Sequence, residues 1–425
     1  VSSNNFINNT LQNQHHIVAQ IFNIMCTYKT SRAILMMSLK LCIKIKRSRN
    51  TNNDYPSVSL FICLSEILEC YANDLNMIMI ALNCIDILWG RVSYISVCPV
   101  ERTCEIIISI LNDNIIQFPG LTQLHNYQVN DNEEGMLIRK QFLKLALYGV
   151  SCMSVDYTFC RHKLCAYPIC KLLTYLIRTV TFPDIIILAL ESIISLCEVP
   201  INLFANTSIV LNTHIQNVII CAKCFIEFGL CEILVDTMCI YKDNINILNK
   251  CIKIYYYLSP YTSCSGGIWG NTRILKMIVS TIETNTDHIS LVTNGLFTIN
   301  NLCNASPKSH IESILRSCRE TGVCTMVIKL LSEKQSSLVW KAVCDLIQSL
   351  SKDVIIKEDF GHANGIKLLS DTVIDPCFDE SLRLQVHNTL MMIVGNSKPN
   401  FERLKNSAYG IACRLNWTTS IKFNL

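Results

Sequence analysis

Cysteine and histidine are the residues of this sequence that could bind a metal or act as nucleophile and base. The chain holds 24 Cys and 9 His. The densest group comprises Cys152, Cys160, His162, Cys165 and Cys170. Thiolates and imidazole could hold zinc tetrahedrally, but a strong zinc pattern pairs two closely spaced couples of ligands. This group does not form such a pattern, so we expect no metal site and no cofactor.

Two further cysteines, Cys221 and Cys224, lie in a run with helical periodicity. Residues i and i+3 of a helix share one face, so we interpret this pair as part of the core. A cysteine nucleophile needs a base and a partner that orients the base, and scattered histidines do not define such a trio. We therefore predict a protein without enzymatic activity. A zinc- or thiol-dependent enzyme is the weaker alternative.

One Gly-rich segment, Ser263 to Asn271, has a composition that could suit a phosphate-binding loop. Its spacing matches neither a P-loop nor a dinucleotide-binding turn, and no strand is predicted before it. We interpret the segment as a loop between repeats, and we expect no small-molecule substrate.

The composition indicates which elements carry these residues. Of the 425 residues, 50% are hydrophobic and 16% are charged, and the chain contains 14 Gly and 10 Pro. A disordered chain would be less hydrophobic and more charged, and an all-β chain would need more turn residues. Apolar residues recur at helical spacing, for example from Leu338 to Leu350. The sequence therefore predicts an all-α fold.

A membrane-spanning segment would need about 18 apolar residues in a row. The best candidate, Leu75 to Trp89, is interrupted by Asn76, Asn83 and Asp86, so we expect no membrane span. Residues 1–14 lack the pattern of a secretory signal. We therefore expect a cytoplasmic location, with the nucleus as the alternative, and cysteines that stay reduced.

The formal net charge of +4 is too small to indicate a nucleic-acid-binding protein. One basic run is compact and consists of Lys40, Lys44, Lys46, Arg47 and Arg49. We interpret it as the basic end of a helix, where cations complement the negative end of the helix dipole. A nuclear-localisation or phosphate-binding patch is the alternative.

A Gly followed by an apolar helix recurs along the second half of the chain. The starts of this pattern, one of which lacks the Gly, are Gly229, Thr272, Gly322, Gly365 and Gly410. The steps between them are about 43, 50, 43 and 45 residues, within or near the range of two- and three-helix solenoid repeats.

The end of an apolar helix recurs with the same rhythm. Its positions are Ser195, Tyr257, Asn301, Ser349 and Met392. The last three steps are about 44, 48 and 43 residues, which agrees with the first landmark. The step before them is longer, and we predict that Pro200 to Thr213 form an inserted loop.

Two stretches resemble the armadillo-repeat family. Gly295 to Cys303 is similar to that family's groove helix, which ends in Leu-x-Asn-Leu. Asn388 to Asn396, followed by Asn400 to Ile411, keeps the family's order of helix, loop, Asn, helix and Gly-Ile. The resemblance covers residues 215–425 and is looser before them. HEAT repeats are the alternative, but their characteristic Pro and Asp/Arg positions are not seen.

The resemblance implies an all-α, right-handed superhelical solenoid of armadillo/HEAT-like repeats. One such repeat cannot bury its own apolar face, so neighbouring repeats share a continuous core. We expect a flexible tail over residues 1–14 and a repeat domain over residues 15–425. Within that domain we expect an irregular half at 15–214 and more regular repeats at 215–425.

If the landmark helix lines the groove, as the resemblance implies, positions one turn apart on it face the partner. These partner-binding candidates are Glu191, Ser195, Lys253, Tyr257, Phe297, Asn301, Asp345, Ser349, Asn388 and Met392. Nuclear-import adaptors of the family hold basic peptides with repeated Trp and Asn and with acidic residues, and only Phe297 and Asn301 approximate that pair. The alternative is that each candidate is an ordinary solvated or half-buried helix position.

The predicted function is a non-enzymatic scaffold or adaptor that holds a protein or peptide partner along the concave face of the solenoid. The mixed charge of the candidates argues against binding of basic import signals. An Asn at such a position can still bond a partner's backbone amide. A transport adaptor that carries cargo to the nucleus or to a membrane is the alternative, and nucleic acid is not expected as a partner.

Overall fold

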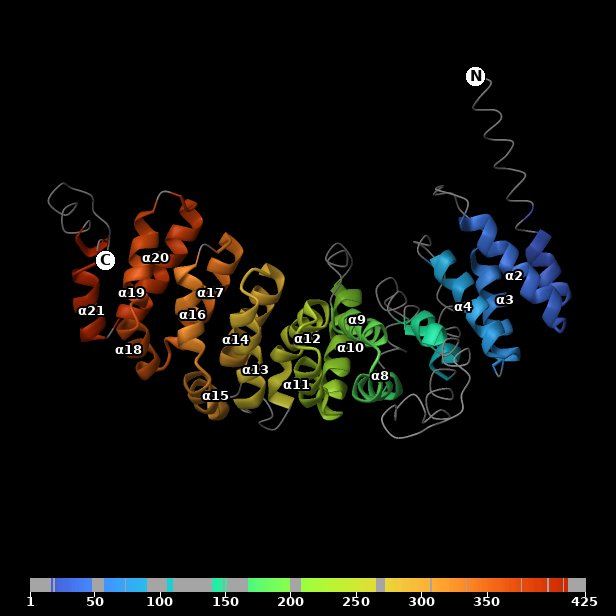
Figure 1. Ribbon diagram of the computed structural model, residues 1–425, viewed down its shortest axis with the longest axis horizontal. Helices are drawn as coiled ribbons and strands as arrows, with labels where there is room; N and C mark the ends of the chain where they lie inside the picture. Colours follow the sequence, from blue (N-terminus) through green and yellow to red (C-terminus); the bar gives the residue numbers. More distant parts are fainter. Residues whose placement is uncertain are drawn as a thin grey trace, which may run out of the picture. The chain divides into compact units, whose positions relative to one another are not determined.

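A computed structural model gives the structure of this protein (Figure 1). It describes residues 17, 20–47, 57–72, 74–89, 105–109, 140–147, 150, 167–198, 208–264, 272–305, 308–333, 335–375, 377–395, 397–407 and 409–411. The regular elements in these ranges are helices, and no strand occurs in them. The chain divides into two compact units, residues 1–228 and 229–425, which are described separately.

The first unit is built from packed helices. Those with defined bounds are α2 (Arg32–Arg47), α3 (Ser57–Cys70), α4 (Leu75–Trp89), α8 (Tyr167–Thr179), α9 (Pro183–Cys197) and α10 (Ser208–Glu227). Helix α4 packs against α2 and α3, and α10 packs against α8 and α9. Shorter helical segments lie at residues 20–27, 105–109 and 140–147.

Polar contacts in this unit join residues about one repeat apart. The guanidinium of Arg32 pairs with the carboxylate of Asp74, 42 residues later. This hydrogen bond holds the pKa of Asp74 below its ordinary value. The hydroxyl of Ser192 on α9 donates to the backbone carbonyl of Leu147, 45 residues earlier, at 3.0 Å. These separations are close to the repeat length predicted for the second unit.

The second unit consists of three-helix repeats. The first helices of the repeats are α15 (Lys308–Glu320), α18 (Val354–His362) and α21 (Lys398–Lys405). The second helices are α11 (Leu230–Ile240), α13 (Thr272–Thr284), α16 (Val323–Ser332) and α19 (Gly365–Ile374). The third helices are α12 (Ile245–Leu258), α14 (Ile289–Ala305), α17 (Ser337–Leu350) and α20 (Glu380–Val394). A short 3-10 helix, η3 (Ser259–Cys264), follows α12.

The second and third helices form two layers. Each second helix packs against the third helix of its own repeat. In the layer of third helices, α12 contacts α14, α14 contacts α17, and α17 contacts α20, as Figure 1 shows. The core lies where the two layers meet, and Leu275, Leu296, Val343 and Leu369 are among its buried side chains.

Polar side chains fix where the third helices begin. The side-chain oxygens of Asn244, Ser336 and Asp379 accept hydrogen bonds from backbone N–H groups three residues later, at 3.3, 3.4 and 2.7 Å. Such N-caps satisfy donors that the helix itself leaves unpaired, and each contributes about 1 kcal/mol of stability. The caps therefore set the register of α12, α17 and α20.

The recurring Gly marks the turn into a second helix. Gly229 and Gly322 have φ angles of 73° and 78°, a left-handed conformation that glycine adopts without strain. In the next repeat the left-handed residue is Asn364, with φ of 66°, and Gly365 is the first residue of α19. A Cβ at Gly365 would lie 2.2 Å from the ring of Phe360. The Gly pattern therefore has two physical causes, turn conformation and close packing.

Hydrogen bonds between neighbouring third helices give the repeat length directly. They join residues that are 40 to 49 positions apart in the chain. The predicted steps of about 43 to 50 residues agree with this range. The predicted all-α solenoid of helical repeats is confirmed.

One predicted loop differs from the structure, and one proline lies within a helix. Helix α10 begins at Ser208, so the later part of the loop predicted at Pro200 to Thr213 is helical, and residues 200–207 lie outside the described residues. Pro399 lies in the first turn of α21, after the N-cap Ser397. Proline is tolerated there because its missing N–H would have had no partner within the helix.

Many of the described cysteines lie in the core. Cys231, Cys251 and Cys303 are fully buried. Burial raises the pKa of the Cys344 thiol to about 12. The Cys344 thiol is therefore protonated at neutral pH and packs as a small apolar group.

No helix in the ranges given above combines the length and the apolar character needed to cross a membrane.

Candidate functional site

Each third helix has one side on the layer of second helices and one side turned away from it. The turned-away sides adjoin one another because the third helices pack side by side. We call this surface the ladder face. Its central side chains are Tyr256 on α12, Phe297 on α14, Asp345 on α17 and Gln385 on α20, and its other members lie one or two turns from these on the same side of each helix.

Close packing shows which side of α14 is turned away. A Cβ at Gly295 would lie 2.7 Å from Cδ1 of Ile282 on α13, so this side of α14 contacts the second layer. Phe297 follows two residues later, about 200° around the helix. On α12, the hydroxyl of Tyr255 donates to the carbonyl of Cys231 on α11 at 2.6 Å, which places Tyr255 on the side of the second layer.

An aromatic cluster lies where α12 meets α14 on the ladder face. The ring centroids of Tyr256 and Phe297 are 6.0 Å apart, and those of Tyr256 and Tyr257 are 5.3 Å apart. The ammonium of Lys253 lies 5.5 Å from the ring centroid of Tyr257, within the range of a cation–π contact. All of these side chains are half-buried. They form an apolar patch with a cationic edge.

Amide and hydroxyl groups join α14 to the elements on both sides of it. The Nδ2 of Asn301 donates to the Oγ of Ser259 in η3 at 2.9 Å. On the other side, the Nδ2 of Asn304 donates to the Oγ of Ser349 at 2.8 Å, and Ser349 donates to the Oδ1 of Asn300 at 2.6 Å. These hydrogen bonds fix the distance between the helices and therefore between the side chains that they display.

The same kind of link joins α17 to α20. The Nε2 of Gln385 donates to the Oδ1 of Asp345 at 2.7 Å and to the backbone carbonyl of Lys341 at 3.3 Å. The Nε2 of Gln348 donates to the Oγ1 of Thr389 at 2.8 Å. Burial raises the pKa of the Asp345 carboxyl, and the hydrogen bond from Gln385 opposes this rise.

Lysines outnumber carboxylates on the ladder face across α12, α14 and α17. Lys250 and Lys253 lie on α12, Lys341 lies on α17, and Lys352 lies two residues after the end of α17. Asp345 is the carboxylate among them, and the sequence of α14 contains no charged residue. Among the described residues, lysine is therefore the more frequent charged side chain on this part of the ladder face.

Two predicted partner-binding residues lack the exposure that the prediction requires. Ser349 is 6% exposed, and its hydroxyl is bonded to Asn300 and Asn304. Ser195, in α9 of the first unit, is 7% exposed and donates to the carbonyl of Glu191 at 2.8 Å. A serine side chain is too short to reach past larger neighbours at such positions, so we remove both from the site.

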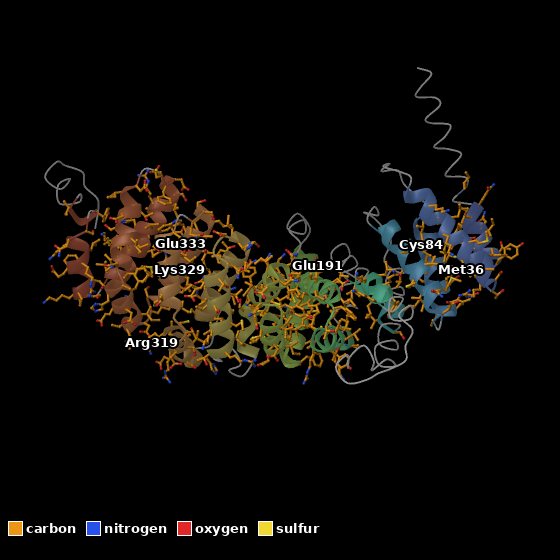
Figure 2. The ribbon with its side chains drawn as sticks, in the orientation of Figure 1. Met36, Cys84, Glu191, Arg319, Lys329 and Glu333 are labelled. Carbon is orange, nitrogen blue, oxygen red and sulfur yellow. The ribbon has the colours of Figure 1, made fainter. Side chains whose placement is uncertain are left out.

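The structure places most of the other candidates on the ladder face. The half-buried ones are Lys253, Tyr257, Phe297, Asn301 and Asp345, and the exposed ones are Asn388 and Met392 on α20. Glu191 is half-buried on α9 and belongs to the first unit (Figure 2). The candidate surface of the second unit is therefore described separately from Glu191.

The residue steps between landmarks do not predict which side chains of neighbouring third helices lie beside one another on the ladder face. The ring beside Phe297 is that of Tyr256, one turn after Lys253, and the side chain bonded to Asp345 is that of Gln385. The steps between landmarks pair Phe297 with Lys253 and Asp345 with Asn388, which lie one helical turn from these observed neighbours. This difference arises because the loops between repeats differ in length. The signal that identifies these residues is the three- and four-residue spacing within each helix.

An open hollow of about 420 Å³ lies beside the N-terminal ends of α14 and α17. It is lined by Thr286, Asp287, Ile289, Glu333, Gln335 and Ser336. Figure 2 marks Glu333, whose Oε2 accepts a hydrogen bond from the Nε2 of Gln335 at 3.0 Å. Carboxylate side chains therefore lie at the N-terminal ends of α14 and α17.

In the described part of the chain, no three Cys, His, Asp or Glu side chains lie close enough to hold a metal ion. Within the cysteine-rich group, Cys170 is buried in α8. Cys221 is buried and Cys224 half-buried in α10. The remaining members lie outside the described residues: Cys152, Cys160, His162 and Cys165.

Two further predicted features are described only in part. Lys40 and Lys44 of the basic run are exposed on α2, which ends at Arg47, whereas Arg49 lies outside the described residues. The Gly-rich segment is described only as far as Cys264, the last residue of η3.

Solved structures share this fold. One of them is described as "A conserved phosphorylation switch controls the interaction between cadherin and beta-catenin in vitro and in vivo". It matches 96% of this chain and 77% of its own, at 12% identity and a TM-score of 0.52.

Designed armadillo repeat proteins are also similar to this chain. One, described as designed for modular peptide recognition, covers 60% of this chain and 94% of its own at 16% identity, with a TM-score of 0.44. Another, in complex with the peptide (KR)4, covers 65% and 99% at 15% identity, with a TM-score of 0.45. No family model and no curated protein matches the sequence. The chain has an armadillo-like repeat fold.

Proposed function

We propose that this chain is a protein-binding scaffold and that its ladder face holds an extended segment of a partner protein. The observation that carries this proposal is the continuity of the face. Side-chain hydrogen bonds join the third helices α14, α17 and α20 to one another, and a further one joins α14 to η3. The surface is therefore fixed before any partner arrives, which lowers the entropic cost of binding.

The dimensions of the face suit an extended segment. Packed helices lie about 8–10 Å apart, so the third helices of the second unit span roughly 30 Å. An extended chain rises about 3.3 Å per residue, which means that about nine residues cross this distance. Such a segment needs hydrogen-bond partners for its backbone, and an amide such as that of Asn388 can both donate and accept.

The similarity to the solved structure from the cadherin and beta-catenin work supports this proposal, because that structure concerns an interaction between proteins. The proposal assigns the chain a role as scaffold or adaptor, in which the partner is held without a chemical step.

Affinity purification from a cell lysate with quantitative mass spectrometry tests the proposal. The ladder variant combines Tyr257→Ala and Asn388→Ala. The matched control combines Lys276→Ala and Thr325→Ala, two exposed positions on the second helices α13 and α16. We expect a set of proteins that the unaltered chain and the control both recover and that the ladder variant loses. Equal recovery by a ladder variant with unchanged circular dichroism would contradict the proposal.

A further inference from the structure

An ion pair and two thiols join the helical segment 20–27 of the first unit to α3. The ammonium of Lys29, in the turn after the segment, pairs with the carboxylate of Glu66 on α3, 37 residues later. Cys26 lies three residues before Lys29, and Cys63 lies three residues before Glu66. Residues three positions apart in a helix share a face. The ion pair therefore turns the two cysteines toward each other, and a hydrogen bond joins their side chains.

The two thiols differ in their access to solvent. Cys26 is half-buried. It lies next to the ion pair of Lys29 and Glu66, whose side chains are 45% and 43% exposed. Cys63, by contrast, is 1% exposed. A small solute can therefore reach Cys26 from solvent, whereas Cys63 is enclosed by the core.

The surroundings of the pair also assign a proton to Cys63. Burial raises the pKa of the Cys63 thiol to about 12, and its interactions with Cys26 and with the carboxylate of Glu66 act in the same direction. Cys63 therefore keeps its proton at neutral pH. The ammonium of Lys29 acts electrostatically on both sulfurs. A partly exposed cysteine close to a cation is the usual setting of a reactive thiol, and Cys26 meets this description.

We propose that Cys26 and Cys63 are a modification site, at which hydrogen peroxide closes the two thiols to a disulfide. In the first step Cys26 loses its proton to solvent, and its sulfur attacks one oxygen of the peroxide. The O–O bond breaks, and the second oxygen takes up a proton and leaves as water. Cys26 is then a sulfenic acid.

In the second step the sulfur of Cys63 attacks the sulfur of Cys26. The S–O bond breaks, and the hydroxide takes the proton of Cys63 and leaves as water. The two thiols together lose two electrons, and the peroxide that takes them up becomes two water molecules. Peroxide therefore converts a contact between two helices into a covalent link, which thiol reductants reverse.

A second pair of thiols in contact provides an internal control. The side chain of Cys318 on α15 is hydrogen bonded to that of Cys303 on α14. These residues are 1% and 0% exposed, so neither sulfur is open to solvent. Contact between thiols is common to both pairs, and access to solvent distinguishes them. The Cys303 and Cys318 pair should therefore react only when the helices around it open locally.

Mass spectrometry of the folded full chain after brief exposure to hydrogen peroxide tests the proposal. Remaining thiols are blocked with N-ethylmaleimide before digestion, so that a linked peptide containing Cys26 and Cys63 reports the disulfide. We expect this linked peptide to form at least tenfold faster than the one that joins Cys303 to Cys318. Equal rates for the two pairs, or a disulfide from Cys26 to another cysteine, would overturn the proposal.

Serine variants distinguish the roles of the two thiols. In Cys63→Ser no thiol remains to attack the oxidised sulfur, so we expect the sulfenic acid at Cys26 to accumulate and to be trapped by dimedone. In Cys26→Ser the remaining thiol is buried, and we expect little dimedone adduct at Cys63. The reverse pattern, in variants with unchanged circular dichroism, would contradict these roles. The linked peptide of the unaltered chain tests the proposal even where a variant does not fold.

The outcome of these experiments does not depend on the proposed function. The two thiols belong to the first unit, whereas the ladder face belongs to the second unit. Failure of the disulfide to form leaves partner binding to be judged by the Tyr257→Ala and Asn388→Ala variant alone.

Discussion

The side-chain amide of Asn301 on α14 donates a hydrogen bond to the Oγ of Ser259, 42 residues earlier, at 2.9 Å. Ser259 is fully buried, and its own hydroxyl donates to the carbonyl of Tyr256 at 2.8 Å. The resemblance to armadillo repeats assigns Asn301 to partner binding. In this chain its amide N–H joins two successive repeats.

Replacing Asn301 with alanine should therefore lower stability. Asn301→Ala removes the donor to Ser259, and the expected cost is about 1 kcal/mol. The control is Asn294→Ala on the same helix, because the Nδ2 of Asn294 contacts only Ser290 of its own helix in the described bonds, at 3.5 Å. Urea unfolding followed by circular dichroism measures both changes. Equal stability of the two variants would contradict a role of Asn301 between repeats.

A second prediction follows from the left-handed turn at Gly322. Space is available for a side chain there, because a Cβ would meet no atom within 4 Å, so the cost of substitution comes from the backbone alone. We expect Gly322→Ala to destabilise the protein by about 1–2 kcal/mol. Gly322→Asn should cost less, since Asn364 adopts the same conformation in the next repeat. Thermal unfolding ranks the variants, and an Asn variant less stable than the Ala variant would contradict this explanation.

A third prediction follows from the contact between α13 and α14. Gly295→Ala places a Cβ 2.7 Å from Cδ1 of Ile282, so we expect a loss of about 1–3 kcal/mol from overpacking. Ile282→Val removes that Cδ1. The double variant should therefore be more stable than the sum of the two single effects predicts, by about 1 kcal/mol. Additive effects on the unfolding free energy would show that the side chains at these two positions do not clash.

His387 on α20 should make stability depend on pH. Its Nδ1 lies 2.9 Å from the hydroxyl of Tyr409, and burial lowers the pKa of the imidazole. The unfolded chain, with a His pKa of about 6.5, then takes up the proton first as the pH falls. The stabilising effect is therefore complete above about pH 7, decreases as the pH falls through about 6.5, and stops changing once folded His387 is also protonated.

Urea unfolding at about pH 7.5 and pH 5.5 measures this dependence. The His387→Gln variant should show a smaller difference in unfolding free energy between the two pH values than the unaltered chain. The matched control is His288→Gln, an exposed histidine in the turn before α14. An unchanged pH difference in the His387 variant would mean that this imidazole does not carry the effect.

The sequence predicts the fold well because repeat spacing and helix periodicity follow directly from the residue types and their order. The Gly landmark at Gly229 and Gly322 corresponds to left-handed turns. The steps between landmarks agree with the separations of the residues that bond between third helices. Gly365 shows that the same residue type also arises from packing, which only the structure reveals.

The candidate site could be predicted only in part. The helices that line it follow from the landmark, and Phe297, Asn388 and Met392 lie on the ladder face. Which side chains of neighbouring helices lie beside one another depends on the lengths of the loops between repeats. A prediction from the steps between landmarks does not take these lengths into account. Burial of Ser349 likewise depends on neighbours that lie far away in the sequence.

Hydroxyl-radical footprinting of the full chain, with and without a protein partner that it recovers from the lysate, tests most directly whether a partner segment occupies the ladder face. We expect binding to reduce oxidation of Tyr257, Phe297 and Met392 several-fold. Oxidation of Phe401 on α21, which is 48% exposed and lies on a first helix, should stay the same. Protection of Phe401 with unchanged oxidation of the ladder residues would place the partner on another surface and contradict this account.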